Sequence, residues 1–122
     1  MTNALLPLLR KGASEQGGQP ARVVNVSSRM GSIGDGSTGG SYGYRASKAA
    51  ENMISVTLAA DLAKDNIYSF AVHPGNVQTK LGGKEADVDP ETCAGELIKV
   101  IENASKEDCG KFLHRNGSVL PW

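Results

Sequence analysis

The 122-residue sequence has little of what marks several large classes of protein. It contains only two cysteines, Cys93 and Cys109, which are too few for a disulfide scaffold or a zinc cage. Its 13 basic side chains balance 13 acidic ones, so there is no electrostatic reason to expect nucleic acid or an anionic membrane as its main partner. No apolar run approaches the ~20 residues of a membrane span, and the N-terminus lacks the charge order of a signal peptide. We therefore expect a cytoplasmic protein without a metal, nucleic-acid or membrane partner.

The composition nevertheless fits a folded domain. Apolar residues make up 39% of the chain and charged residues 21%, which argues against disorder. The length suits one domain, residues 1–122, with a real core. Glycine is the abundant residue, with 15 copies. Because glycines cluster between Ser27 and Ser41, we expect that stretch to be a loop.

Strands and helices alternate over the rest of the sequence. The expected strands, each short and rich in apolar residues, are 21–26, 67–73 and 111–114. The first expected helix is 3–11, which Gly12 ends and a polar loop over 12–20 follows. The second runs from Tyr42 to about Lys64. The third is capped by Asp89 and has Pro90 at its first position. A turn at Asn116-Gly117 leads to an apolar end, 119–122. This alternation predicts an α/β fold with a parallel sheet covered on both faces, which binds ligands at the carboxyl ends of its strands.

Ser28, Tyr44 and Lys48 are the side chains best suited to chemistry. Tyr44 and Lys48 are four residues apart at the start of an expected helix, so they lie on one face. An ammonium group beside a tyrosine hydroxyl favours the phenolate, and such a tyrosine transfers protons near neutral pH. Ser28 follows the first expected strand, where its hydroxyl would hold a carbonyl oxygen in place.

The segment from Gly34 to Gly39 matches the letters G-x-G-x-x-G of dinucleotide-binding loops. That motif requires its first glycine at the end of a strand and its last at the start of a helix. Here the expected strand ends earlier, before Ser27. We therefore expect this segment to form a wall of the substrate cleft rather than a pyrophosphate site.

Three motifs, in this order along the chain, resemble the C-terminal half of a short-chain dehydrogenase/reductase. They are Val23-Val24-Asn25-Val26-Ser27-Ser28, Tyr44-Arg45-Ala46-Ser47-Lys48-Ala49-Ala50 and His73-Pro74-Gly75-Asn76-Val77-Gln78-Thr79. The ending, Leu120-Pro121-Trp122, is similar to that of sniffer-type carbonyl reductases and bacterial C-factor proteins.

The resemblance implies an NAD(P)-dependent oxidoreductase that reduces a small carbonyl substrate or oxidises the corresponding alcohol. Tyr44 would be the general acid for reduction and the base for oxidation. Ser28, rather than Ser27, would hydrogen-bond the substrate oxygen. Lys48 would bind the nicotinamide ribose in addition to favouring the phenolate of Tyr44.

The third motif is the one that the resemblance assigns to the cofactor. Pro74 and Gly75 would shape the wall beside the nicotinamide, and the Val77 backbone and the Thr79 hydroxyl would hold its carboxamide. The cofactor would be NADP or NAD, with the family slightly favouring NADP.

The resemblance covers only the C-terminal part of a Rossmann-like, doubly wound parallel sheet of three αβα layers. The glycine-rich pyrophosphate loop and the catalytic asparagine of such enzymes would belong to an N-terminal half that is missing here. We therefore expect the 122 residues to be inactive in isolation, and a homo-oligomer to form through the helix following Tyr42. The alternative is an inactive, truncated relic or partial gene product that acts at most as an interaction subunit.

Overall fold

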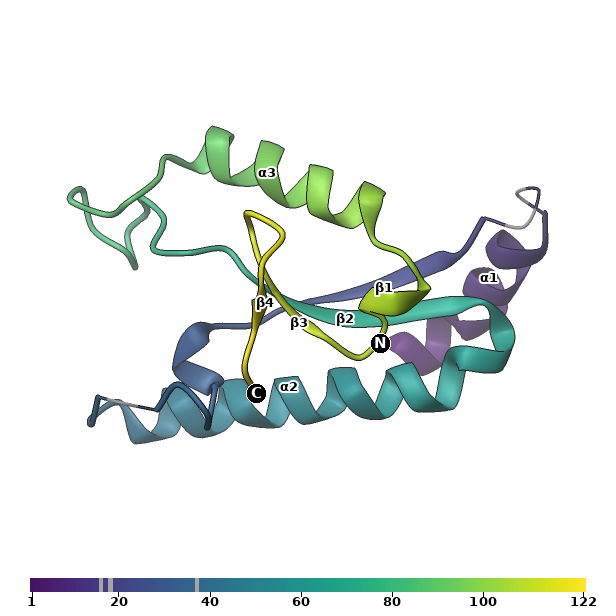
Figure 1. Cartoon of the computed structure of the whole chain (residues 1–122), viewed down its shortest axis with the longest axis horizontal. Coiled ribbons are helices and arrows are strands. Elements are labelled where there is room, and N and C mark those ends of the chain that lie inside the picture. Colours follow the sequence, from purple (N-terminus) through teal and green to yellow (C-terminus); the bar gives the residue numbers. More distant parts are fainter. Residues whose placement is uncertain (16, 18, 37) are drawn as a thin grey trace.

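A computed structural model describes residues 1–15, 17, 19–36 and 38–122 (Figure 1). The strands are short, and helices and turns connect them. In chain order the elements are α1 (Thr2–Glu15), β1 (Ala21–Val26), the 3₁₀ turn η1 (Arg29–Gly31), α2 (Tyr42–Leu62), η2 (Ala63–Asp65), β2 (Ile67–His73), α3 (Pro90–Asn103), η3 (Lys106–Asp108), β3 (Phe112–His114) and β4 (Val119–Leu120).

The four strands form one sheet in the order β1-β2-β3-β4. The pairs β1–β2 and β2–β3 are parallel, and the register places Val26 beside Val72 and His73 beside His114. The last pair, β3–β4, is antiparallel, so the apolar end of the chain adds a strand that its sequence did not predict. The turn that reverses the chain contains Gly117, whose φ of +87° favours glycine.

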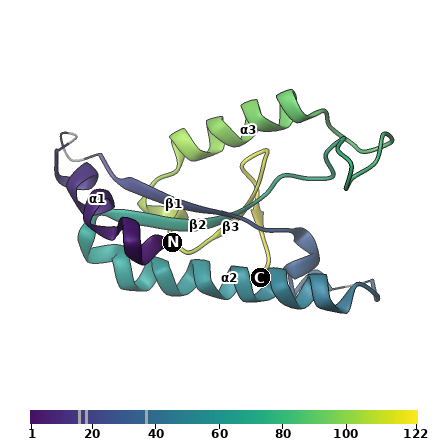
Figure 2. The ribbon, with the colours of Figure 1, turned by 180° about the vertical axis from the view of Figure 1, so that it is seen from behind.

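Helices cover both faces of the sheet (Figures 1 and 2). α3 lies on one face, and α1 and α2 lie on the other. Under α3, the buried residues Phe70, Val72 and Leu113 form one core cluster. On the other face, Leu62 of α2 and Ile67 of β2 pack in a second. The expected three-layer α/β architecture is therefore confirmed.

Two helix boundaries test the sequence signals. The Asp89 carboxylate accepts a hydrogen bond from the Thr92 amide at 2.9 Å, which confirms it as the cap of α3. The expected stop at Gly12 is wrong, because α1 continues to Glu15. Ala13 is buried in the cluster with Leu62, and this packing carries the helix past a glycine. The polar loop expected from Gly12 begins only after α1, and Gln16 and Gly18, which fall in it, lie outside the described residues.

β1 is an edge strand. It pairs with β2 on one side, and in the described part of the chain no strand pairs with its other side. None of the helices in the described residues is long and apolar enough to cross a membrane.

Candidate active site

The carboxyl ends of β1 and β2 lie side by side, because Val26 and Val72 are paired. The loops that leave these ends enclose a cavity of about 210 Å³. Its lining includes six of the seven residues that the motifs single out, namely Ser28, Tyr44, Pro74, Gly75, Val77 and Thr79. The other lining residues are Ser27, His73, Leu81 and Gly82. Segments up to about fifty residues apart in sequence therefore meet at one site.

The two serines after β1 have different hydrogen bonds. Ser27 is tied to the scaffold, because its amide donates to the Val72 carbonyl at 2.8 Å and its hydroxyl to the Lys48 carbonyl at 3.4 Å. The Ser28 oxygen accepts from the Met30 amide at 3.2 Å, which caps η1. A hydroxyl that accepts in this way keeps its proton for donation. The geometry therefore favours Ser28 as the residue that donates to a ligand in the cavity.

Tyr44 and Lys48 both project from the start of α2. The Tyr44 side chain is accessible, since the residue is 40% exposed. The Lys48 ammonium donates to the Val26 carbonyl at 2.9 Å and to the Glu51 carboxylate at 2.6 Å. Two of its three N–H donors are therefore occupied, one at the end of β1 and one within α2. Among the seven predicted site residues, Lys48 is the one that does not line the cavity.

Sequence analysis did not single out Glu51, although its spacing from Lys48 contains the signal. Residues three apart in a helix are neighbours, and Lys48 and Glu51 form such an ion pair on α2. This pair fixes the direction of the ammonium toward β1.

Gly31 sets the distance between η1 and α2. A Cβ at this position would lie 2.6 Å from the Lys48 carbonyl carbon and 2.7 Å from its Cβ. Asn52, one turn further along α2, donates to the Gly31 carbonyl at 3.3 Å. The turn that begins at Ser28 is therefore packed directly against the helix that carries Lys48.

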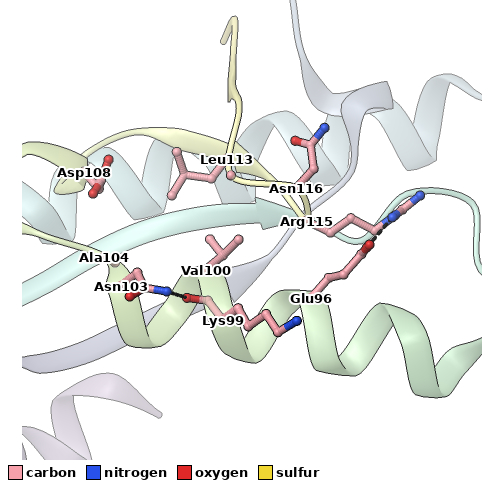
Figure 3. Close-up of a pocket in the computed structure, with 10 residues that line it drawn as sticks. Glu96, Lys99, Val100, Asn103, Ala104, Asp108, Leu113, Arg115 and Asn116 are labelled. Carbon is pink, nitrogen blue, oxygen red and sulfur yellow. Dashed lines mark hydrogen bonds and ion pairs between the residues drawn. The ribbon is translucent and has the colours of Figure 1, made fainter.

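The loop after β2 packs against α3 and the β3–β4 turn. Gly75 has a φ of +81°, and a Cβ there would lie 2.8 Å from the Arg115 Nε. The Arg115 amide donates to the His73 carbonyl at 3.0 Å, and its guanidinium pairs with Glu96 of α3 (Figure 3). The Cys93 thiol of α3 donates to the Pro74 carbonyl at 3.3 Å. These contacts fix the start of the loop that lines the cavity.

Hydrogen bonds within the loop stabilise its end. Its Thr79 hydroxyl donates to the Val77 carbonyl at 3.3 Å and accepts from the Gly82 amide at 3.2 Å. A Cβ at Gly82 would come within 2.0 Å of the same carbonyl, so only glycine fits there. The Thr79 hydroxyl must exchange its local acceptor to donate to a ligand, whereas its second lone pair can accept from one directly.

His73 and His114 form a pair that sequence analysis missed. Their rings lie 5.5 Å apart in an edge-to-face arrangement, because β2 and β3 pair them in register. Burial lowers the pKa of His73 to about 4, with smaller contributions from His114, Arg29 and Arg115. The neutral imidazole of His73 therefore lines the cavity. The signal was the position of each histidine at the end of a strand, which becomes a contact only once the register is known.

A larger cavity, of about 510 Å³, lies between α3 and the β3–β4 turn (Figure 3). Its lining includes Arg115, Glu96 and Lys99 but none of the motif residues. Size alone would favour this cavity, whereas the gathered hydroxyl groups favour the smaller one.

A mostly parallel sheet between helices, with the predicted site residues gathered at the carboxyl ends of its strands, defines a protein of the Rossmann-like class. Residues 1–89 match the family described as short chain dehydrogenase, and the chain belongs to this family.

Known relatives agree with this assignment. The chain is 38% identical to the C-signal protein of Myxococcus xanthus over 122 residues, which are 100% of this chain and 70% of that protein. The structure of the carbonyl reductase Sniffer of D. melanogaster matches with a TM-score of 0.95 and 36% identity, over 99% of this chain and 51% of that one. The NADPH-bound carbonyl reductase from chicken fatty liver matches with a TM-score of 0.90 and 37% identity, over 99% and 51%. The resemblance to sniffer-type and C-factor proteins is thus confirmed, and the chain spans about half the length of most of the curated relatives it matches.

Proposed function

We propose that this chain supplies the substrate-binding and nicotinamide-binding side of an NAD(P)-dependent carbonyl reductase. The observation that carries the proposal is the single cavity at the ends of β1 and β2. It joins two hydroxyl groups, Ser28 and Tyr44, to the loop from Pro74 to Thr79. Two hydroxyl groups at one small cavity suit a carbonyl oxygen, which accepts two hydrogen bonds.

Tyr44 acts as the general acid for reduction and as the base for alcohol oxidation. Its exposed hydroxyl is free to approach a substrate oxygen and to give up its proton there. Ser28 positions the same oxygen with the hydroxyl proton that its cap interaction leaves available. Lys48 keeps one N–H beyond its bonds to Val26 and Glu51, and this donor serves the nicotinamide ribose.

The residues around the cavity fit a nicotinamide cofactor. Gly75 allows the backbone of the cavity wall to pack closely against Arg115, and the Val77 backbone and the Thr79 hydroxyl offer polar partners for a carboxamide. The cofactor would supply the hydride that reduces the carbonyl carbon. NADP is the preferred form, and the NADPH bound by the chicken relative supports it.

Two further features complete the proposal. α2 leaves Met53 and Ile54 exposed, which supports self-association along this helix. Cys93 and Cys109 are free thiols, which supports a reducing, cytoplasmic setting. The competing proposal is an inactive interaction subunit.

The Tyr44→Phe variant tests the proposal. The experiment uses the whole protein that the gene encodes. Phenylalanine keeps the ring and removes only the transferable proton. We expect the variant to lose nearly all NADPH-dependent carbonyl reduction, by about a hundredfold or more, and to keep its affinity for NADPH in calorimetry. A variant that keeps more than about a tenth of the wild-type kcat contradicts the assignment of Tyr44 as the proton donor. A wild-type protein that binds no cofactor supports the interaction subunit instead.

A further inference from the structure

A third cavity has a volume of about 220 Å³. Its described lining is Arg29, Met30, Asp35, Thr38 and Arg45, and we call it the arginine cavity. Two of these residues directly follow active-site residues in the chain, since Arg29 follows Ser28 and Arg45 follows Tyr44. At two points, therefore, consecutive residues of the chain line the active-site cavity and the arginine cavity.

Hydrogen bonds through Met30 join the two cavities. The Met30 amide donates to the Ser28 hydroxyl at 3.2 Å. The carbonyl of the same residue accepts from the Arg45 Nη1 at 3.4 Å. One residue of η1 thus separates the hydroxyl that would bind the substrate carbonyl from the guanidinium of Arg45.

Arg45 is held in place and still has donors to offer. A guanidinium carries five N–H donors. Three of those of Arg45 bind loop groups, the Gly40 carbonyl at 3.1 Å, the Met30 carbonyl, and the Thr38 hydroxyl at 2.7 Å. Among the hydrogen bonds of the described residues, each terminal nitrogen keeps one N–H. A guanidinium held in this way can donate to the oxygens of a carboxylate.

The charge of the region is positive. Arg29 pairs with Asp35, so this pair is neutral and the charge of Arg45 is left over. The described lining of the active-site cavity contains no acidic side chain. Arg29 also acts on that cavity, because its charge adds to the effects of burial and of His114 that lower the pKa of His73. An anionic group is therefore favoured at the mouth of the site.

We propose that the arginine cavity binds a carboxylate on the substrate, so that the preferred substrates are carbonyl compounds that carry a negative charge. The proposal rests on the proposed function, since it places the substrate carbonyl at Ser28 and Tyr44. Arg45 binds the carboxylate through its two remaining N–H groups. Arg29, which shares its charge with Asp35, strengthens the field around it.

The first test compares the three isomers of formylbenzoate with their methyl esters, using NADPH and the protein as its gene encodes it. Acid and ester have the same carbonyl and differ in charge, and the three isomers vary the distance between the two groups. We expect at least one acid to exceed its ester by about tenfold in kcat/KM. We expect the preference to fall as salt is added. Equal kcat/KM values for all three pairs overturn the proposal.

Substitutions locate the effect. Arg45→Gln and Arg29→Gln are each expected to lower the acid-to-ester ratio several-fold, whereas Asp35→Asn, which removes the neutralising carboxylate, raises it. The ester is the internal control, because unchanged ester kinetics show that the loop is intact. Arg10→Gln is the matched control, since Arg10 pairs with Asp65 at 2.8 Å on the surface near α1. If Arg45→Gln does not fold, the Arg29 and Asp35 variants decide, and ratios unchanged in both overturn the proposal.

A binding measurement separates this proposal from the proposed function. Benzoate is titrated into protein without cofactor, and the Nε–H signals of the arginines are followed by NMR. We expect the Arg45 and Arg29 signals to shift and the Arg10 signal to stay. Shifts without any turnover of acid or ester contradict the proposed reductase but retain the carboxylate site. Turnover without a charge preference or shifts contradicts the carboxylate site alone.

Discussion

Gly31 and Lys48 are in direct backbone contact, so that a methyl group on Gly31 would come within 2.6 Å of the Lys48 carbonyl carbon. Gly31 ends the turn that Ser28 caps, and Lys48 supplies the ammonium at the end of β1. This contact therefore fixes the two chemically important segments relative to one another. Backbone atoms on the helix side leave little room for adjustment.

The Gly31→Ala variant is expected to lose stability, because its methyl group meets the backbone of α2. Overpacking of this kind costs about 1–3 kcal/mol, which would lower the Tm by several degrees. Gly12→Ala is the control. Gly12 lies inside α1 and has open space around its Cβ position, so alanine should stabilise the helix by about 0.5–1 kcal/mol. Thermal unfolding of both variants is the measurement, and a Gly31→Ala protein as stable as wild type contradicts the contact.

Lys48→Met is expected to weaken both NADPH binding and turnover, since the proposed role of its ammonium is to bind the nicotinamide ribose. The resemblance also assigns this ammonium to the tyrosine, so its removal should move the pH profile of alcohol oxidation to higher pH. Glu51→Gln is the comparison. It keeps the ammonium and removes its carboxylate partner, so it should leave the pH profile closer to wild type. An unchanged profile in an active Lys48→Met protein contradicts this role of Lys48.

His73 is expected to stay neutral down to about pH 4, because burial and the neighbouring His114 lower its pKa. The unfolded chain takes up this proton near the ordinary value of 6.5. The free energy of unfolding should therefore decrease as the pH falls from 6.5 to about 4, and this contribution should level off below that range. NMR titration of the ring protons and urea unfolding at several pH values measure the two effects.

His114→Gln removes the second cause of the shift and leaves the first. The pKa of His73 should rise in this variant yet stay below 6.5, because burial is the largest cause. A His73 ring that titrates at its ordinary pKa in the wild-type protein contradicts the half-buried position at the end of β2.

The 122 residues alone are expected not to bind NADPH tightly. In the described residues, β1 has one edge without a partner strand, and the segment from Gly34 does not follow a strand directly and begins no helix at Gly39. Ser37, within that segment, lies outside the described residues. A pyrophosphate would therefore lack the strand–turn–helix that normally binds it. Calorimetry is the measurement, and micromolar binding contradicts this division of labour.

Sequence patterns predicted the elements that carry strong local signals. The apolar run of β2 and the Asp89-Pro90 start of α3 are examples, and the structure confirms both. The short strand β4 has only two residues, too few for a pattern, and its pairing depends on the turn before it. The end of α1 depends on the burial of Ala13, which is a tertiary effect.

In the candidate site, too, some features follow from local sequence signals and others depend on tertiary structure. Ser28, Tyr44 and the loop from Pro74 to Thr79 were predicted from motifs, and the structure brings them to one cavity. Their roles stay predictions. The contacts that position them, such as that of Gly75 with Arg115, join segments far apart in sequence. No local pattern encodes such contacts, because they depend on the strand order and the register.

Trp122 gives the protein a built-in optical reporter. It is the single tryptophan of the sequence, its ring stacks on Phe112 at 5.5 Å, and its carbonyl accepts from the Gly34 amide at 2.6 Å. Gly34 belongs to the segment between Ser28 and Tyr44, so a movement of that segment changes the surroundings of the only indole. Its fluorescence would therefore follow the segment beside the active site directly, without an added dye.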